Sequence, residues 1–259
     1  MLGSLIGMVH LGALAGAPQF AGNMRSVVQQ AVDDAVALQQ AGFDALLVEN
    51  FGDSPFFSDC VPPVTIAAVA RAVSSVIDAT SLPVGVNVLR NDALGAISIA
   101  AACDASFIRV NVLSGTMFTD QGVLEGKAAE LSRLRALLGR DIEILADVFV
   151  KHAVPPAGLT LTQAVRDLCE RGGADALIVS GSGTGEPTEI ADIDQVRAAC
   201  GHLPIYVGSG ATLETIVQIL RHADGAIVGT AIEVDGHTAH PVDPDRAAAF
   251  VAAARGDTE

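Results

Sequence analysis

The sequence predicts one α/β domain over residues 1–259, a closed (β/α)8 TIM barrel of the phosphate-binding type. Short apolar runs bounded by turn residues alternate eight times with segments of helical periodicity. Continuous apolar strands separated by helices are typical of a parallel sheet that is covered on both faces. An aspartate recurs before every second strand, and two glycine-rich turns follow the last two strands. Barrels of this kind commonly bind phosphate at the last two turns.

The elements follow one another in a regular order. Asn23 precedes the first helical run, and Asp243 with Pro244 opens the last one. Thr160 and Gln163 have the spacing of a capping box, which predicts a helix start. The strands are predicted at residues 5–10, 45–49, 83–88, 107–111, 143–148, 176–180, 205–208 and 226–228.

The recurring aspartate marks a repeat of two strands and two helices. Leu-Pro pairs at residues 82–83 and 203–204 precede the third and seventh strands, whereas the even strands begin after the aspartate. Side chains of alternate strands fill alternate layers inside a barrel, which gives this period a physical meaning. A doubly wound open sheet is the alternative, but it would not be expected to show the repeat along the whole chain. The aspartates are Asp44, Asp104, Asp175 and Asp224.

The composition favours a large core and argues against several classes of partner. Hydrophobic residues make up 50% of the chain and charged residues 17%, which is ample for a single core. The formal net charge is −15 and no cluster of Lys or Arg occurs, so we expect no binding to nucleic acid or to anionic lipid. Phosphate binding must therefore depend on local N–H groups and a few placed cations.

The first 24 residues contain no Asp, Glu, Lys or Arg, so a signal peptide has to be considered. Its basic segment is missing, and His10, Pro18 and several glycines interrupt the apolar run, so no integral membrane segment is predicted. We expect a cytoplasmic protein, peripheral to a membrane only in a photosynthetic source. The cysteines show no CxxC or Cys/His spacing, so we expect free thiols at Cys60, Cys103, Cys169 and Cys200.

Two glycine-rich turns predict the phosphate site. A helix is expected to start at Thr212, and N–H groups at a helix start attract an anion together with the helix dipole. The alternative is that the glycines serve only tight strand-to-helix turns. The residues expected to contact phosphate are Gly208, Ser209 and Gly210 after the seventh strand, Gly229 and Thr230 after the eighth, and Ser180, Gly181 and Ser182 after the sixth.

Polar side chains recur at the carboxyl ends of the strands, where barrel active sites are assembled. Side chains alternate along a strand, and Ile108 and Val110 must face the helices, so Arg109 and Asn111 are expected to point into the barrel. The same alternation directs four other residues to the mouth, and two more follow in the loop after the fifth strand. These are His10, Glu49, Asn87 and Asp147, with Lys151 and His152 in the loop.

Each of these residues has a structural and a catalytic interpretation. Arg109 needs a carboxylate, either Glu49 or Asp147, and the pair could be an ion pair without chemistry. Glu49 and Asp147 could instead divide the work of general acid and base, because carboxylates in unlike surroundings titrate apart. Lys151 could form a Schiff base only if it were desolvated, and is otherwise a solvated or phosphate-binding lysine. His10 is either a core histidine or a proton shuttle.

Two further segments of the chain contain residues that could have a function. Asp235, His237 and His240 contain metal-ligating groups, but their irregular spacing in a Gly/Thr-rich loop favours a solvated loop, and no metal or other cofactor is expected. Residues 114–122 form a long connection after the fourth strand, which predicts a lid over the ligand or an ordinary surface loop.

With these residues assembled, the chain resembles the BtpA family, which is named for photosystem I biogenesis and includes SgcQ-like bacterial proteins. The resemblance implies a barrel similar to the phosphoribosyl isomerases of histidine and tryptophan biosynthesis, and it implies no established reaction. Ala15 departs from the proline that such sequences often have, which affects only the first loop. The resemblance covers nearly the whole chain and is carried by residues 6–11, 45–53, 84–92, 107–112, 119–122, 150–153, 179–187 and 228–230.

Two classes of function remain open. The first is an enzyme, an isomerase or an aldolase-type lyase, that acts on a phosphorylated sugar or nucleotide-like metabolite. The second is a non-catalytic assembly or regulatory factor for photosystem I that binds a phosphorylated ligand. Buried polar groups gathered at a barrel mouth favour the enzyme, because they cost stability without compensating partners. We expect a phosphorylated small-molecule ligand and a homo-oligomer in either case.

Overall fold

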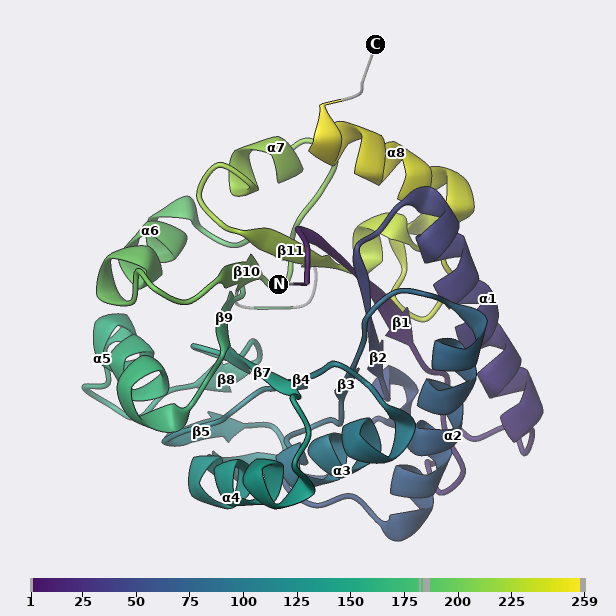
Figure 1. Cartoon of the computed structure of the whole chain (residues 1–259), viewed down its shortest axis with the longest axis horizontal. Coiled ribbons are helices and arrows are strands. Elements are labelled where there is room, and N and C mark those ends of the chain that lie inside the picture. The colour runs from purple at the N-terminus through teal and green to yellow at the C-terminus, as the bar shows by residue number, and fades with distance from the viewer. Residues whose placement is uncertain (1, 182, 184–186, 257–259) are drawn as a thin grey trace.

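Eight parallel strands close into a barrel with helices around it, as the sequence predicts (Figure 1). The structure is a computed structural model that describes residues 2–181, 183 and 187–256. Neighbouring strands follow the chain order around the ring, and the last pairs with the first. The strands are β1 (Leu5–His10), β2 (Ala45–Glu49), β3 (Val84–Asn87), β4 (Phe107–Val110), β7 (Glu143–Asp147), β9 (Ala176–Val179), β10 (Ile205–Val207) and β11 (Gly225–Val228).

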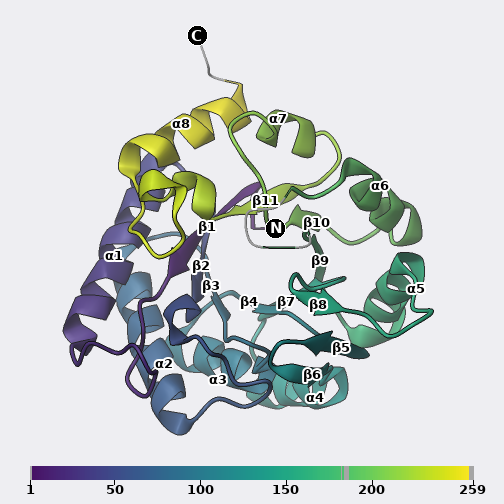
Figure 2. The same ribbon diagram turned by 180° about the vertical axis from the view of Figure 1, so that it is seen from behind.

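The helices form an outer ring in both views (Figures 1 and 2). Asn23 caps the first helix by accepting hydrogen bonds from the N–H groups of Arg25 and Ser26, and Asp243 caps the last one similarly. The helices are α1 (Met24–Ala41), α2 (Pro63–Ala79), α3 (Ala93–Cys103), α4 (Ala128–Leu138), α5 (Leu161–Arg166), α6 (Ile190–Ala199), α7 (Ile216–Ile219) and α8 (Pro244–Arg255); α5 continues as the π-helix η2 (Asp167–Gly172), and short 3-10 helices lie at η1 (Phe51–Asp53), η3 (Thr230–Ile232) and η4 (Val234–Gly236).

The predicted capping box at Thr160 forms only in part. Thr160 Oγ1 accepts a hydrogen bond from the N–H of Gln163 at 3.2 Å. The Gln163 side chain does not return this bond, because its amide donates forward to Asp167 Oδ1 at 2.9 Å. The helix start is therefore where the sequence predicts it, with half of the expected reciprocal pair.

Side chains on the strands alternate between two separate cores. Ile108, Val110 and their equivalents pack beneath the helices, whereas a second cluster that includes Phe107 and Tyr206 fills the barrel interior. Gly85 makes room for this interior layer, because a Cβ there would lie 2.2 Å from the Phe107 ring. The next inward layer toward the carboxyl ends is polar, so the alternation that builds the core also builds the mouth.

Three of the four recurring aspartates bind the amino-terminal ends of strands through backbone N–H groups. Asp44 Oδ2 accepts from the N–H of Leu5 at 2.9 Å. Asp175 and Asp224 accept in the same way from the first residues of β7 and β10. Each of the four aspartates also forms an ion pair with an arginine; the pairs are Asp44–Arg255, Asp104–Arg140, Asp175–Arg135 and Asp224–Arg197. The aspartate repeat in the sequence thus corresponds to a set of electrostatic contacts at the end of the barrel where the strands begin.

The predicted lid after β4 forms a small antiparallel sheet. Strands β5 (Thr116–Thr119) and β6 (Gly122–Glu125) make a hairpin, and β5 also pairs with β8 (Ala153–Val154) from the loop after β7. Figure 2 shows this sheet beside the barrel ring. The hairpin tip, Asp120 and Gln121, lines a cavity at the barrel mouth. The segment therefore has regular structure where the sequence suggested only a long connection.

The helix expected to start at Thr212 begins later. α7 covers only Ile216–Ile219, and the N–H of Thr212 donates to Thr215 Oγ1 at 2.9 Å. The Gly208–Gly210 turn is therefore followed by a loop, and a helix dipole does not act on it. The expectation of a helix N-terminus at this turn was wrong, because Thr212 and Thr215 satisfy each other locally.

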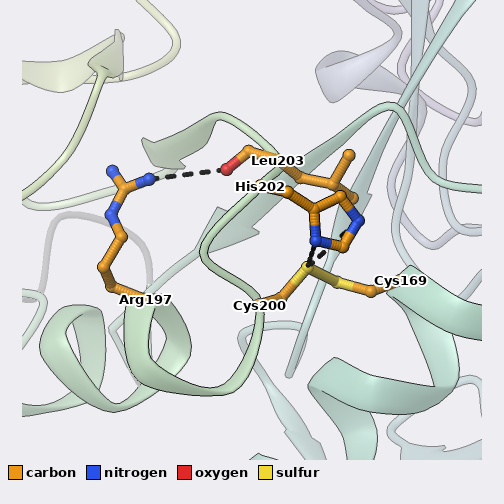
Figure 3. The surroundings of a disulfide bond; sticks show 5 residues. All are labelled: Cys169, Arg197, Cys200, His202 and Leu203. Atoms are coloured by element: carbon orange, nitrogen blue, oxygen red, sulfur yellow. Dashed lines mark hydrogen bonds between the residues drawn. A yellow bond between two sulfur atoms is a disulfide. The ribbon is translucent and has the colours of Figure 1, made fainter.

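The prediction of four free thiols was also wrong. Cys169 in η2 and Cys200 at the end of α6 form a disulfide, whereas Cys60 and Cys103 are free (Figure 3). The His202 ring lies beside this bond, with Nδ1 3.6 Å from Cys200 Sγ. The two cysteines are 31 residues apart in the chain, and only the packing of α5 and its π-helical extension near α6 brings them together.

Among the residues that the structure describes, no helix has the length and apolar character needed to cross a membrane.

Candidate active site at the barrel mouth

Two adjoining cavities occupy the carboxyl end of the barrel. The first, the inner cavity, is lined by His10 and by the turns after β10 and β11. The second, the outer cavity, is lined by Arg90, His152 and the hairpin tip at Asp120 and Gln121. The two share four lining residues, which are Glu49, Phe51, Arg109 and Lys151. A ligand in one cavity would therefore lie against the same charged side chains as a ligand in the other.

Arg109 and Asp147 form a buried bidentate ion pair. Arg109 Nε and Nη2 donate to the two carboxylate oxygens of Asp147 at 3.0 and 2.8 Å. Asn111 Nδ2 donates to the same carboxylate at 3.0 Å, and Ser180 Oγ at 3.3 Å. Burial alone would lower the pKa of Arg109, but the charge and hydrogen bonds of Asp147, with the charge of Glu49, raise it above its ordinary value. The guanidinium is thus a permanent positive charge at the mouth.

Asn87 links this ion pair to the neighbouring strand. Its Nδ2 donates to the Arg109 carbonyl at 3.0 Å and to Asn111 Oδ1 at 3.1 Å. Its own Oδ1 is buried and has no hydrogen-bond partner in the described part of the chain. The expected residues Asn87, Arg109, Asn111 and Asp147 therefore form one hydrogen-bonded network.

Glu49 is placed differently from Asp147. It is 6% exposed and lines both cavities. His10 Nε2 lies 3.8 Å from its Oε1. No donor within the described ranges forms a hydrogen bond with its carboxylate, whereas four donor contacts reach Asp147. Of the two carboxylates, Glu49 is the one whose oxygens are open to a ligand.

His10 lies between Glu49 and a second buried carboxylate, Glu233. His10 Nδ1 is 2.6 Å from Glu233 Oε1, and the Glu233 side chain is almost fully buried. Nδ1 is thus the ring nitrogen bound to Glu233, and Nε2 is the one on the side of Glu49, 3.8 Å from its Oε1. Phe51 packs against the imidazole at a centroid distance of 4.9 Å. The ring is therefore fixed in orientation by a charge on one side and an aromatic ring on another.

Lys151 lines both cavities from the loop after β7, and its backbone is anchored there. Arg90 Nη2 donates to the Lys151 carbonyl at 2.5 Å. Burial lowers the pKa of Lys151, and the charge of Arg109 lowers it further, against the opposing effects of Glu49 and Asp147. His152 lines the outer cavity next to it and has a positive φ of 58°.

The predicted phosphate turns line the inner cavity. No acceptor among the described residues takes a hydrogen bond from the N–H groups of Gly210, Gly229 or Thr230. The N–H of Gly208 is occupied, because it donates to the Val179 carbonyl at 2.8 Å. Gly208 contributes space instead, since a Cβ there would lie 2.4 Å from the Ile178 side chain and 3.2 Å from Arg109.

The turn after β9 contributes less than the sequence suggested. Ser180 donates to Asp147, and the N–H of Gly181 donates to Ser209 Oγ at 3.2 Å. These groups connect the turn to its neighbours and are not directed at an anion. Ser182, the third residue expected here, lies outside the described residues.

The loop with Asp235, His237 and His240 lies beside the inner cavity. The two imidazole rings stack at 4.7 Å, and His240 Nδ1 lies 3.1 Å from the Val234 carbonyl. In the chain as far as it is described, no three His, Cys, Asp or Glu side chains gather closely enough to hold a metal ion.

Sequence reasoning missed Glu233 and Arg90. Glu233 precedes the loop that contains Asp235. It is flanked by Ile232 and Val234, and a single charged residue between apolar residues is a signal that it is buried with a partner. Arg90 belongs to the segment after β3 that carries the family resemblance, but alternation along the strand gives no direction for a loop residue.

Comparisons with known proteins agree with this architecture. The sequence profile of the BtpA family matches residues 1–256. An uncharacterised protein of Thermococcus kodakarensis is 47% identical over 97% of this chain and 95% of its own length. The photosystem I biogenesis protein BtpA of Synechocystis is 43% identical over 96% of this chain and 87% of its own length. The putative sgc region protein SgcQ of Escherichia coli is 31% identical over 96% and 92% of the two chains.

Solved structures with low sequence identity share the barrel. N-(5'-phosphoribosyl)anthranilate isomerase from Pyrococcus furiosus superposes with a TM-score of 0.61 at 13% identity, over 98% of this chain and 99% of that one. A native KDPGal structure gives 0.59 at 17% identity, over 97% and 94%. At such identities these similarities establish the fold alone.

Proposed function

The chain belongs to the BtpA family, and from that premise and the geometry of the mouth we propose that it is an enzyme acting on a phosphorylated small metabolite. The reaction is an isomerisation or an aldol-type cleavage. The observation that carries the proposal is the inner cavity, which is lined by His10, Glu49, Arg109 and Lys151 and by two turns whose N–H groups at Gly210, Gly229 and Thr230 have no acceptor among the described residues.

The unbonded N–H groups support a phosphate ligand. Gly210, Gly229 and Thr230 have donors without acceptors, and Arg109 adds a permanent positive charge beside them. Successive N–H groups in a turn form an anion-binding concavity even where no helix follows. The formal net charge of −15 would repel anions at long range, so local donors of this kind must supply the affinity.

His10 and Glu49 are the groups that we assign to proton transfer. His10 Nε2 and Glu49 Oε1 are 3.8 Å apart and both residues line the cavity, so a substrate atom beside this pair could be within hydrogen-bond distance of both and exchange a proton with either. Gly229 lies against the same ring, since a Cβ there would be 2.8 Å from His10 Cε1. A phosphate on this turn would therefore hold the substrate's neighbouring carbons next to the imidazole.

Asp147 has a different task in this proposal from the acid or base that the sequence suggested. Its two oxygens already accept from Arg109, Asn111 and Ser180. We assign it to holding Arg109 in position, with Asn87 and Asn111 completing the network. Lys151 and His152 remain next to the substrate, where a positive charge would stabilise a developing oxyanion.

A non-catalytic role is the second candidate, and one relative supports it. The Synechocystis protein that is 43% identical to this chain is named for photosystem I biogenesis. A binding factor would use the same phosphate turns but would have no need of an oriented histidine. Turnover of a bound ligand therefore separates the two candidates.

The test begins with a thermal-shift screen of sugar phosphates and inorganic phosphate, followed by assays for isomerisation and cleavage. Glu49→Gln should lower turnover by about two to four orders of magnitude and leave binding intact. Thr230→Asp should weaken phosphate binding by about two orders of magnitude, because a like charge at the anion position costs several kcal/mol. Thr230→Asn is the matched control of the same size without the charge.

The outcomes separate the candidates. Equal phosphate affinity in Thr230→Asp and Thr230→Asn would contradict the phosphate site. A ligand that binds tightly but is never converted would favour the binding factor.

A further inference from the structure

Lys151 is a half-buried amine in a site rich in charges, and it has no hydrogen-bond or ion-pair partner among the described residues. It lines the inner and the outer cavity. Throughout the residues that the structure describes, no carboxylate forms an ion pair with its Nζ and no acceptor takes a hydrogen bond from it, although Glu49 and Asp147 are close enough to influence its charge. Burying an ammonium group without a partner is costly, and such a cost is usual where the group has a chemical task.

Groups on four elements around Lys151 determine its state. Two arginines, Arg109 on β4 and Arg90 after β3, repel a positive charge on Lys151. Two carboxylates, Glu49 on β2 and Asp147 on β7, attract it. Burial is the largest influence, and the net result is a lowered pKa. A larger fraction of the amine is therefore unprotonated at a given pH than in a solvated lysine, and the unprotonated amine is the nucleophilic form.

The backbone of Lys151 is fixed from the opposite side of the mouth. The guanidinium of Arg90, itself only 5% exposed, donates to the Lys151 carbonyl. This contact joins the loop after β3 to the loop after β7 and limits where the side chain can reach. A nucleophile needs such a defined position to meet a carbonyl carbon.

We propose that Lys151 forms a Schiff base with a phosphorylated ketone or aldehyde whose phosphate is held by the turns after β10 and β11. This inference rests on the function proposed above and names the class of substrate. It requires that the cavity containing the phosphate turns also contain the amine, and Lys151 lines that cavity together with Gly210, Gly229 and Thr230.

The steps balance without an oxidant or a reductant. The Nζ lone pair attacks the carbonyl carbon, and a proton moves from nitrogen to oxygen to give a carbinolamine. The hydroxyl leaves as water after taking a second proton, which leaves a protonated imine. Its nitrogen then accepts electrons as the C–C bond between the next two carbons of the chain breaks, which leaves an enamine on Lys151.

Glu49 is suited to take the proton released in that step. The proton comes from the hydroxyl group of the departing fragment, whose carbon becomes a carbonyl carbon. The Glu49 carboxylate lines both cavities and receives no hydrogen bond from the described residues. The same proton is then returned to the enamine carbon, which restores the imine, and addition of water to the imine carbon releases Lys151 as the free amine.

The sequence contains its own control, because it has only two lysines, Lys127 and Lys151. Lys127 forms an ion pair with Asp59. Burial is the largest single influence and lowers the pKa of Lys127, but the hydrogen bond and charge of Asp59, with smaller effects of Cys60 and Asp92, together raise it above the ordinary value. The two amines are thus shifted in opposite directions, and any reagent that selects the neutral amine should distinguish them.

The experiment traps the imine on the wild-type protein. Pyridoxal 5'-phosphate, an aldehyde with a phosphate, and dihydroxyacetone phosphate, a smaller ketone, are each added and reduced with borohydride, which converts an imine into a stable secondary amine. Peptide mass mapping then locates the adduct. We expect the Lys151 peptide to carry at least about tenfold more adduct than the Lys127 peptide, and inorganic phosphate to suppress it.

Two variants and one binding measurement make the result decisive. Lys151→Arg should abolish the adduct, and Lys127→Arg should label as the wild type does. Equal labelling of both lysines, or no Lys151 adduct with either probe, would overturn the Schiff base. If calorimetry shows in that case that the wild type binds inorganic phosphate, the proposed function stands without the Schiff base. If the wild type does not bind inorganic phosphate, the proposed function itself is contradicted.

Discussion

His10 Nδ1 and Glu233 Oε1 lie 2.6 Å apart, and this contact joins the first strand of the barrel to the segment that follows the last strand. The two residues are 223 positions apart in the sequence. The contact fixes the imidazole so that Nε2 faces Glu49 in the inner cavity. A carboxylate bound to one ring nitrogen of a histidine fixes the orientation of the ring, so the other nitrogen, here Nε2, is the one placed for proton transfer.

The first prediction concerns this pair. Glu233→Gln keeps the size of the side chain but removes the charge that orients His10, so turnover should fall by about two to four orders of magnitude. Inorganic phosphate should bind with unchanged affinity, since no hydrogen bond within the described ranges joins the Glu233 side chain to the phosphate turns. Steady-state kinetics on the substrate found by the screen gives the measurement. A fall in phosphate affinity equal to the fall in turnover would show that Glu233 supports the fold of the turns and not the chemistry.

The second prediction concerns the Arg109–Asp147 ion pair. Asp147→Asn leaves the Arg109 charge buried without its bidentate partner, so the free energy of unfolding should fall by about 3–5 kcal/mol. Asp104→Asn is the matched control, because Asp104 pairs with Arg140 on the surface with a side chain that is 71% exposed, and a surface pair is worth about 0–1 kcal/mol. Urea denaturation measures both. Equal losses in the two variants would mean that burial does not strengthen the Arg109 pair.

The third prediction uses the lowered pKa of Lys151. At a pH below that pKa the lysine is charged in both states, and the folded protein bears the whole cost of burying the charge. As pH rises from the lowered pKa toward the ordinary value of 10.5, the unfolded chain binds more protons than the folded one, so stability increases. Lys151→Met should therefore stabilise the protein most at neutral pH, and the gain should shrink as pH approaches 10.5.

Lys127→Met is the control for this prediction, because the pKa of Lys127 is shifted in the opposite direction and its effect on stability therefore has the opposite sign. Its pKa is raised by Asp59, so its contribution favours the folded state at neutral pH and is lost as pH rises through the raised pKa. Unfolding free energies at several pH values measure both variants. A gain for Lys151→Met that does not change with pH would show that improved packing, and not the removal of a charge, is responsible.

The fourth prediction concerns the disulfide. Denatured protein without reductant should show two reactive thiols, from Cys60 and Cys103, and reduced protein should show four. Replacing Cys169 and Cys200 together by alanine should lower the free energy of unfolding by about 3–4 kcal/mol, because a cross-link over 31 residues restricts the unfolded chain. The control is wild-type protein alkylated at Cys60 without reduction. Four thiols before reduction would contradict the pairing.

The barrel could be predicted from the repeat of two strands and two helices along the sequence. The direction of its strand residues could be predicted from the alternation of side chains along each strand. Once Ile108 and Val110 were assigned to the helix side, Arg109 had to point inward, and the structure places it there. The same rule directed Glu49, Asn87 and Asp147 to the mouth. Nothing in the period tells how these side chains pair, so the choice of Asp147 over Glu49 as the partner of Arg109 required the coordinates.

Loop residues were predicted less well because no period governs them. Glu233 and Arg90 reach the site from loops, and their direction depends on contacts with elements far away in the chain. The disulfide has the same cause, since Cys169 and Cys200 meet through the packing of two helical segments. The helix expected at Thr212 begins at Ile216 because a local hydrogen bond between Thr215 and Thr212 was preferred.

The aspartates at the amino-terminal ends of the strands determine which parts of this protein could be altered without disturbing the barrel. Asp44, Asp175 and Asp224 each accept an N–H from the first residues of the preceding strand, so a slip of one residue would break these bonds and turn the site residues away from the mouth. Strand alignment is thus maintained at one end of the barrel, and the candidate site lies at the other. The loops at the mouth could be exchanged or randomised to select new specificities, while these aspartates and their arginine partners keep the strands in register.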